Sequence, residues 1–276
     1  MDVVFHLREG AAHQFKHAEM LCQGIKSCGD NPSYGVCDVS SNSDVEAIWS
    51  WKQMRLIRNA IKNKRNILVM ERGFIPNRMQ WCSLAINGLN GKGKYTPSPD
   101  NGERFADNFG HLLKPWRYNN AKSVLLIGQV YSDPSMYGTN HNVWLQEQTT
   151  KLKNLGYEVI FRQHPWVKSH TQQLGLKPFV PAGAILSENV DLYDDFDQVD
   201  FCVTFNSNTA VEAVLYGLPT VTFNDGSIAY EVTSHNYDNP MLMPDRHEWC
   251  NNLAWKQWED EELIDGTAWE HVRKSL

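Results

Sequence analysis

The segment Phe201–Phe223, FCVTFNSNTAVEAVLYGLPTVTF, constrains the fold of this chain more than any other. It opens with a mostly apolar run, typical of a buried strand, and passes through small polar residues into a helical pattern. Gly217 and Pro219 end that pattern, and a second apolar strand follows. A strand, a helix and a strand in so short a stretch indicate a parallel βαβ unit, whose sheet needs covering helices.

The same alternation of strands and helices runs through both halves of the chain. In the second half we expect strands over residues 124–127, 157–161, 201–205 and 220–223 and helices over 143–154, 192–197 and 209–216. In the first half we expect strands over 3–6, 34–39 and 66–70 and helices over 15–27 and 45–64, the longer helix being capped by Ser43 or Asp44. Residues 71–120 are irregular, and residues 247–272 predict a tryptophan-rich helical tail.

These elements predict an α/β fold with two Rossmann-like lobes that face each other across a cleft. We expect a first lobe over residues 1–120, a second over 121–245, and C-terminal helices over 246–276 that pack back toward the first lobe. Ligands of such sheets bind near the carboxyl ends of the strands, so we expect the site there.

Composition excludes several classes of protein. The chain has 276 residues, of which 42% are hydrophobic and 21% charged, and this is typical of a globular protein. No stretch approaches eighteen apolar residues, and the first residues, MDVVFHLREG, lack the pattern of a signal peptide, so we expect a cytoplasmic protein. The cysteines form no C-x-x-C pair and no zinc-ligand spacing, so we expect reduced thiols and no metal site.

Four small polar residues lie where the strand at 201–205 meets its helix: Asn206, Ser207, Asn208 and Thr209. The N-terminus of a helix carries free backbone N–H groups and a partial positive charge, and hydroxyls add further donors, so this segment suits a phosphate. The alternative is an ordinary cap, in which Ser207 or Asn208 satisfies the N–H groups of its own helix.

A second polar cluster, FRQHPW, closes the strand at 157–161. Arg162 can bind phosphate through its bidentate fork, and His164 can donate to a phosphate or to a leaving oxygen, while Pro165 fixes the backbone that presents them. Because parallel strands end at one edge of a sheet, we expect Arg162 and His164 to face the same cleft as residues 206–209. The alternative is a solvated turn.

Glu71 directly follows the last strand of the first half. A carboxylate in this position can act as a general base that takes a proton from a hydroxyl group, and Glu71 is our first choice for such a base, with Asp100 and His13 in reserve. The alternative is that Glu71 forms an ion pair with Arg72 or Arg78 as scaffolding.

Charge is distributed unevenly along the chain. Residues 1–120 hold 16 Lys and Arg against 11 Asp and Glu, whereas residues 121–276 hold 10 against 21. The candidates for binding a polyanionic acceptor are Lys52, Arg55, Lys62, Arg65, Arg72 and Arg78. We expect the first four to share one face of the predicted helix, opposite Ile57 and Ile61. The alternative is a charged face that only meets solvent.

Several stretches together resemble a phage-encoded family of GT-B-like glycosyltransferases related to capsule-polysaccharide and sialic-acid-type transferases. They are AIWSWK, ERGFIPNRMQWCSLAINGLNG, LLIGQ, RQHP, NSNTAVEAVLYGLP and LAWKQWEDEELIDGTAWEHV. The resemblance implies a GT-B fold and the transfer of a sugar from a nucleotide-sugar co-substrate, UDP- or CMP-linked. It implies no further cofactor and no metal.

The resemblance also implies roles for single residues and an acceptor. The donor-binding residues would be Gln129, Arg162, His164, Asn206, Ser207, Asn208 and Thr209, with Glu212 a candidate for the ribose. His164 would also be catalytic if it assists the departure of the nucleotide. Glu71 would be the catalytic base of an enzyme that inverts the configuration of its sugar, whereas a retaining enzyme would need no such base. Some phages use such enzymes to glycosylate hydroxymethylated pyrimidines of their own DNA, which the basic first half fits, so we expect DNA as partner in the cytoplasm of an infected host. A surface glycan acceptor and a non-catalytic nucleotide- or DNA-binding module are the alternatives.

Overall fold

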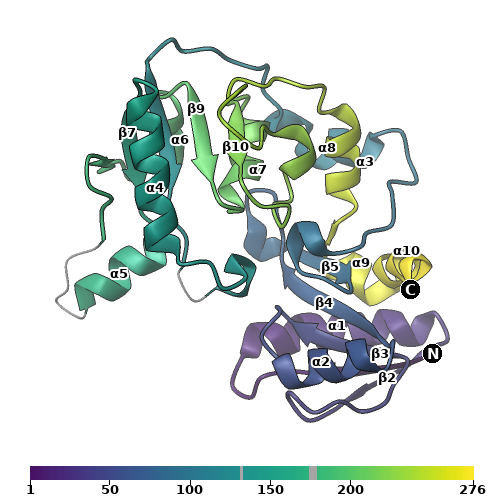
Figure 1. Ribbon diagram of the computed structural model, residues 1–276. Helices are drawn as coiled ribbons and strands as arrows, with labels where there is room; N and C mark the ends of the chain where they lie inside the picture. The colour runs from purple at the N-terminus through teal and green to yellow at the C-terminus, as the bar shows by residue number, and fades with distance from the viewer. Residues whose placement is uncertain (131–132, 174–178) are drawn as a thin grey trace. The chain divides into compact units, whose positions relative to one another are not determined.

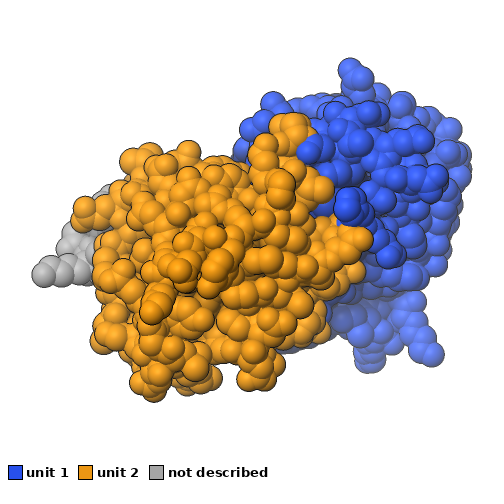
Figure 2. Space-filling model, turned by 90° about the horizontal axis from the view of Figure 1, so that it is seen from above, with its two compact units in different colours: residues 1–110, 247–276 blue, residues 111–246 orange. Residues whose placement is uncertain are grey.

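The computed structural model describes residues 1–130, 133–173 and 179–276, and the chain forms two compact units (Figures 1 and 2). Unit 1 comprises residues 1–110 and 247–276, and unit 2 comprises residues 111–246. The C-terminal segment is therefore part of the same unit as the N-terminus.

Unit 1 is built on a six-stranded sheet with the order β11-β5-β4-β3-β1-β2. Its strands are β1 (Asp2–His6), β2 (Asn31–Tyr34), β3 (Val45–Trp49), β4 (Asn66–Arg72), β5 (Cys82–Ile86) and β11 (Gln257–Trp258). Its helices are α1 (Ala12–Ser27), α2 (Met54–Lys62), α3 (Glu103–Phe109), α8 (His247–Ala254), α9 (Asp260–Asp265) and α10 (Thr267–Val272). The strands β1 to β4 pair in parallel, β5 pairs antiparallel with β4, and β11 pairs antiparallel with β5.

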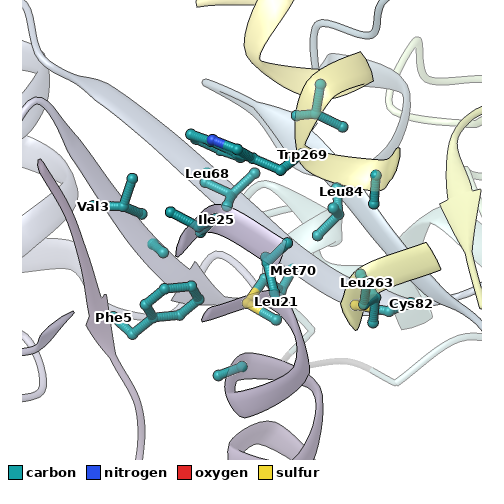
Figure 3. Close-up of a cluster of buried hydrophobic side chains, with 14 of the residues drawn as sticks. Val3, Phe5, Leu21, Ile25, Leu68, Met70, Cys82, Leu84, Leu263 and Trp269 are labelled. Carbon is teal, nitrogen blue, oxygen red and sulfur yellow. The ribbon is translucent and has the colours of Figure 1, made fainter. Parts of the chain in front are cut away.

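The main core of unit 1 lies between this sheet and helices from both ends of the chain (Figure 3). Phe5 from β1, Leu21 from α1 and Trp269 from α10 are fully buried there. Gly24 permits the close approach of α1 to α9, because a Cβ at this position would overlap the carbonyl oxygen of Leu263. The C-terminal segment therefore supplies part of the first unit's core.

Two elements predicted for unit 1 are wrong. Residues 45–64 form the strand β3 followed by α2, where one helix was expected. All five residues of β3 are buried between the parallel strands β1 and β4, so the strand lacks the alternating pattern that would distinguish it from a helix. The strand predicted over 34–39 lies instead at Asn31–Tyr34, at the edge of the sheet.

The helix cap predicted at Ser43 or Asp44 is also wrong. The carboxylate of Asp38 accepts hydrogen bonds from the backbone N–H groups of Arg55 (2.9 Å) and Leu56 (3.1 Å), in the first turn of α2. The capping residue of α2 thus lies in the loop before β3, sixteen positions ahead of the start of the helix. The sequence next to the helix therefore cannot reveal it.

Unit 2 is built on a five-stranded, fully parallel sheet with the order β10-β9-β6-β7-β8. Its strands are β6 (Ser123–Ile127), β7 (Glu158–Arg162), β8 (Ile185–Leu186), β9 (Phe201–Thr204) and β10 (Thr220–Thr222). Its helices are α4 (His141–Asn154), α5 (Pro165–Gln173), α6 (Leu192–Phe196) and α7 (Thr209–Leu215). Helix α4 packs against β7, and α7 packs against β9 and β10 (Figure 1).

The strand order of unit 2 reverses between β6 and β9. From β6 the chain moves outward to β7 and β8, and it then returns to the other side for β9 and β10. In open parallel sheets, ligands bind at the carboxyl ends of the strands where the order reverses. This point therefore defines where the site of unit 2 is expected.

The α/β class predicted from the sequence is confirmed. The C-terminal segment contains the helices expected there, and it also adds the strand β11, which pairs with β5. In the part of the chain that the structure describes, no helix has the length and apolar character needed to span a bilayer.

Candidate functional site

Two buried side chains link the loops that follow β6 and β9. The amide nitrogen Nε2 of Gln129 donates to Oδ1 of Asn206 (2.9 Å), and the backbone N–H of Asn206 donates to Oε1 of Gln129 (3.1 Å). Nδ2 of Asn206 also donates to the carbonyl oxygen of Ser135 (2.6 Å) and to Oδ1 of Asn224 (3.1 Å). The network joins the loops after β6, β9 and β10 at the point where the sheet order reverses.

The network places Ser207, Asn208 and Thr209, all partly exposed, at the start of α7. The hydroxyl of Ser207 accepts the backbone N–H of Thr209 (3.2 Å) and donates to Oγ1 of Thr209 (3.2 Å). Ser207 therefore satisfies one N–H group at the start of α7, as the alternative interpretation holds in part, and its hydroxyl lies beside that of Thr209 at the predicted phosphate position.

Glu212 lies in the first turn of α7 and is partly buried. Burial raises the pKa of Tyr193 of α6 to about 12, and the negative charge of Glu212 adds to that rise. The structure thus places the Glu212 carboxylate on the same short helix as Thr209.

Gly217 ends α7 in the left-handed region, with φ of +83°. A Cβ at this position would overlap the carbonyl oxygen of Pro115, so both the backbone conformation and the close approach require glycine. Pro219 follows, and its carbonyl oxygen accepts the N–H of Cys202 (2.9 Å). The structure therefore gives Gly217 a packing reason to be glycine, and Pro219 leads directly into β10.

The side chain of Arg162 is fixed by hydrogen bonds within unit 2. Its Nη1 donates to the carboxylate of Asp195 (2.5 Å), which is only 1% exposed, and its Nη2 donates to the carbonyl oxygen of Val190 (2.9 Å). Nη1 also lies within hydrogen-bond distance of the carbonyl oxygens of Asn189 (3.1 Å) and Asp191 (3.3 Å). Arg162 therefore fixes the loop that leads into α6.

His164 follows β7 and is partly buried. Its Nδ1 accepts the backbone N–H of Trp166 (3.2 Å), so a neutral ring carries its proton on Nε2. Because β7, β6 and β9 are consecutive parallel neighbours, His164 leaves the same sheet edge as Gln129 and Ser207. At the usual strand spacing, β7 and β9 lie about 10 Å apart.

A histidine that the sequence did not single out supports the first loop. Nε2 of the buried His141, at the start of α4, accepts the backbone N–H of Gln129 (2.7 Å). Burial lowers the pKa of His141 to about 4, so the ring is neutral near pH 7. No local pattern marks this residue, since its partner is a backbone group twelve positions earlier.

In unit 1, Glu71 lies partly buried at the end of β4. Its Oε1 accepts the backbone N–H of Arg72 (3.0 Å), and it forms no ion pair with any residue that the structure describes. Nε of Arg78 donates to the carbonyl oxygen of Gly73 (2.6 Å). The ion pair with Arg72 or Arg78 that was the alternative is therefore not observed.

The two reserve bases differ in their surroundings. Asp100 accepts hydrogen bonds from the N–H of Gly102 (2.9 Å) and from Nε1 of Trp255 (3.1 Å). Burial favours a higher pKa for Asp100, but these hydrogen bonds outweigh it and lower the pKa, which makes Asp100 a poor base. His13 is exposed on α1, with its ring edge-on to Trp49 at a centroid distance of 5.1 Å.

The predicted basic face is only partly formed. Because α2 spans Met54–Lys62, Lys52 and Arg65 lie outside the helix, and the prediction that they share its face is wrong. Nη1 of Arg65 donates to the buried carboxylate of Glu46 (3.0 Å). Arg65 is partly buried, whereas six cations of this region are exposed. Within the described residues these six form no ion pair: Lys52, Arg55, Arg58, Lys62, Lys64 and Arg72.

Among the described residues, no group of three or more His, Cys, Asp or Glu side chains is arranged to hold a metal ion. All six cysteines are free thiols. Tyr131 and Ser132, in the loop after Gln129, lie outside the described residues.

Two α/β units with these sheets define a fold of the GT-B type. Among solved structures, the chain is similar to the beta Kdo 2,7 transferase of Thermosulfurimonas dismutans KpsC, with 15% identity, 97% of this chain and 99% of that chain covered, and a TM-score of 0.59. It is also similar to the beta Kdo 2,4 transferase of Thermosulfurimonas dismutans KpsC, with 15% identity, 95% and 97% covered, and a TM-score of 0.57. No protein-family model and no curated protein sequence matches the chain. At this level of identity the likeness establishes a shared fold.

Proposed function

We propose that this chain is a glycosyltransferase that uses a nucleotide-sugar donor. The observation that carries the proposal is the set of polar loops at the reversal point of the unit 2 sheet, fixed by Gln129 and Asn206. Hydrogen-bond donors at this position suit the phosphates of a nucleotide. The fold shared with two Kdo transferases supports the same proposal.

In the proposed donor site, each polar group has a separate task. The hydroxyls of Ser207 and Thr209, with Asn208, bind the donor phosphates, and Nε2–H of His164 stabilises the negative charge that develops as the sugar leaves. Glu212 binds the ribose. Gln129, Asn206 and Arg162 act as positioning residues, because their side chains bond to the protein itself.

Glu71 is the proposed general base of the acceptor side. It is a carboxylate at a strand end, and within the described residues the side chain accepts a hydrogen bond from the adjacent backbone N–H of Arg72. A general base must accept a proton from the acceptor hydroxyl, and no described Lys or Arg forms an ion pair with this carboxylate.

The proposed acceptor is DNA that contains 5-hydroxymethyl-pyrimidine. The exposed cations from Lys52 to Arg72 support a polyanionic acceptor, since none is neutralised by a carboxylate in the described part of the chain. Such an acceptor would be met in the cytoplasm of a phage-infected bacterium. A glycan acceptor is the second candidate, and the shared fold with the Kdo transferases favours it.

One experiment tests donor and acceptor together. The protein is incubated with UDP- and CMP-linked sugars and with DNA containing hydroxymethylcytosine or hydroxymethyluracil, and nucleoside masses are measured after digestion. A mass increase of one sugar is expected, and the matching unmodified DNA should show none. Transfer to a glycan but not to DNA would support the second candidate, and binding without any transfer would support a non-catalytic module.

The base is tested by Glu71→Gln. We expect transfer to fall by about 10²- to 10⁴-fold while the donor Kd stays within about twofold, because the change removes proton transfer and leaves unit 2 intact. Glu19→Gln, an exposed position on α1, is the matched control. Undiminished transfer in both Glu71→Ala and His164→Ala would refute the mechanism.

A further inference from the structure

Two buried polar atoms of unit 2 have no hydrogen-bond partner among the described residues. They are Nδ1 of His141 and Oε1 of Gln163, on side chains that are 2% and 8% exposed. An unsatisfied buried polar group costs about 1–3 kcal/mol, so proteins normally satisfy such groups with water or with a ligand. Two of them in one unit therefore need an explanation.

Both residues line the same cavity. Its volume is about 10 Å³, and Leu145 of α4, Phe161 of β7 and Val167 of α5 supply apolar walls. A space of this size holds about one oxygen atom with its hydrogens. No lining residue is an acid, a lysine or an arginine, so the cavity suits a neutral group.

The hydrogen bonds around His141 fix which atom is the donor. Because the backbone N–H of Gln129 donates to Nε2 (2.7 Å), the proton of the neutral ring is on Nδ1. Oε1 of Gln163 is a carbonyl oxygen and can only accept. The cavity therefore offers one N–H donor and one acceptor.

A single oxygen that satisfies both atoms must accept one hydrogen bond and donate another. A hydroxyl group or a water molecule does both, whereas a carbonyl oxygen only accepts and an ammonium group only donates. A charged group would also lose its hydration without gaining an opposite charge.

We infer that the cavity between His141 and Gln163 is a binding site for one hydroxyl-type oxygen, which accepts from Nδ1–H and donates to Oε1. The oxygen comes either from water or from a hydroxyl of the nucleotide sugar. The second source rests on the proposed function, and it follows from position: the cavity is lined by Gln129, beside the proposed phosphate loops, and Gln163 immediately precedes His164.

The test uses Gln163→Leu, which removes the hydrogen-bond acceptor Oε1 and puts an apolar side chain of similar size in its place. Binding of UDP-glucose, UDP, 2′-deoxy-UDP and 3′-deoxy-UDP is measured by calorimetry, and thermal unfolding is followed without ligand. Gln146→Leu is the matched control, because Gln146 lies on α4 outside the cavity and bonds to Ala182.

If a ribose hydroxyl occupies the site, one deoxy analogue binds the wild type about tenfold more weakly than UDP, and Gln163→Leu erases that difference. If a hydroxyl of the transferred sugar occupies the site, the wild type binds UDP-glucose more tightly than UDP, and Gln163→Leu removes that difference in affinity. If water is the only occupant, ligand preferences are unchanged, but the Tm falls by about 2–4 °C and a crystal structure shows a water bridging both atoms.

The inference would be overturned if Gln163→Leu left the ligand preferences unchanged and did not lower the Tm. This result would mean that Oε1 has no hydrogen-bond partner in the wild type. The proposed function fails separately if the wild type binds none of the four ligands. In that event the Tm and the crystal structure still decide whether an oxygen occupies the cavity.

Discussion

The two units each bury one carboxylate that holds an arginine, and they do so with different partners. In unit 1, Glu46 is fully buried and bonds to His6 (2.6 Å) as well as to Arg65 (3.0 Å). In unit 2, Asp195 bonds to Arg162 (2.5 Å) and otherwise to neutral groups, the side chains of Ser187 and Asn189. His6 also forms a hydrogen bond through Nδ1 with the carbonyl oxygen of Val36 (2.8 Å), so both of its ring nitrogens have partners within unit 1.

This comparison separates structural arginines from exposed ones. Arg65 and Arg162 both resembled ligand-binding cations in the sequence, yet each is neutralised by a buried carboxylate of its own unit. Most of the other polar side chains that follow β6 and β9 are neutral, among them Gln129, Ser207 and Thr209. In unit 1, by contrast, the exposed cations of α2, Arg55, Arg58 and Lys62, form no ion pair with the residues that the structure describes.

Removing either buried carboxylate should produce the largest effects. We expect Glu46→Ala and Asp195→Ala each to lower the free energy of unfolding by about 3–5 kcal/mol, because each leaves a buried cation without its partner. Glu46→Ala should be the more harmful, since it strands both His6 and Arg65. Urea unfolding measures both changes.

Glu188→Ala is the control for these substitutions, because Glu188 is exposed and lies seven positions before Asp195 in the chain. It should change stability by less than about 0.5 kcal/mol. Similar losses in all three variants would mean that the buried carboxylates have no special role.

Arg162→Lys should have an intermediate effect. A lysine cannot reproduce the fork that joins Asp195 and the Val190 carbonyl, so we expect a loss of about 1–3 kcal/mol in unfolding free energy. The Kd for UDP should change less than about threefold, whereas Ser207→Ala should weaken UDP binding by about tenfold. Weaker UDP binding without any loss of stability in Arg162→Lys would show that Arg162 contacts the donor directly.

Acid should produce the smallest and most selective effect. Burial of Glu46 favours a higher pKa, but hydrogen bonds from Ser40 and Ser41 and the charge of His6 outweigh it, so the pKa is lowered. A lowered folded-state pKa stabilises the protein above the usual pKa of a glutamate, and this stability is lost as the pH falls through the folded-state value.

Glu46→Gln removes that titration. Its unfolding free energy should therefore fall less steeply than that of the wild type as the pH is lowered below about 4.5. Parallel acid profiles, measured by urea unfolding at each pH, would contradict this assignment and place the acid sensitivity in other carboxylates.

The sequence predicted what depends on local pattern. The α/β class and the polar clusters after β7 and β9 were predictable, because hydrophobic periodicity and strand-end polarity are read within a few residues. The partners of Arg65 and Arg162 were not predictable, because Glu46 lies in β3 and Asp195 in α6, both distant in the sequence from the arginines that they bind. The strand β3 was mistaken for a helix since burial on both faces removes its alternation, and β11 is too short to show a pattern.

The insertion of unit 2 within unit 1 has a consequence for synthesis on the ribosome. Residues 111–246 emerge before β11, α9 and α10, so unit 2 can fold while the sheet of unit 1 still lacks an edge strand and part of its cover. Until then Leu21 and Met70 lack the neighbours that bury them in Figure 3. The unit that begins first is thus the last to be completed, and its nascent apolar face is the one that chaperones would need to protect.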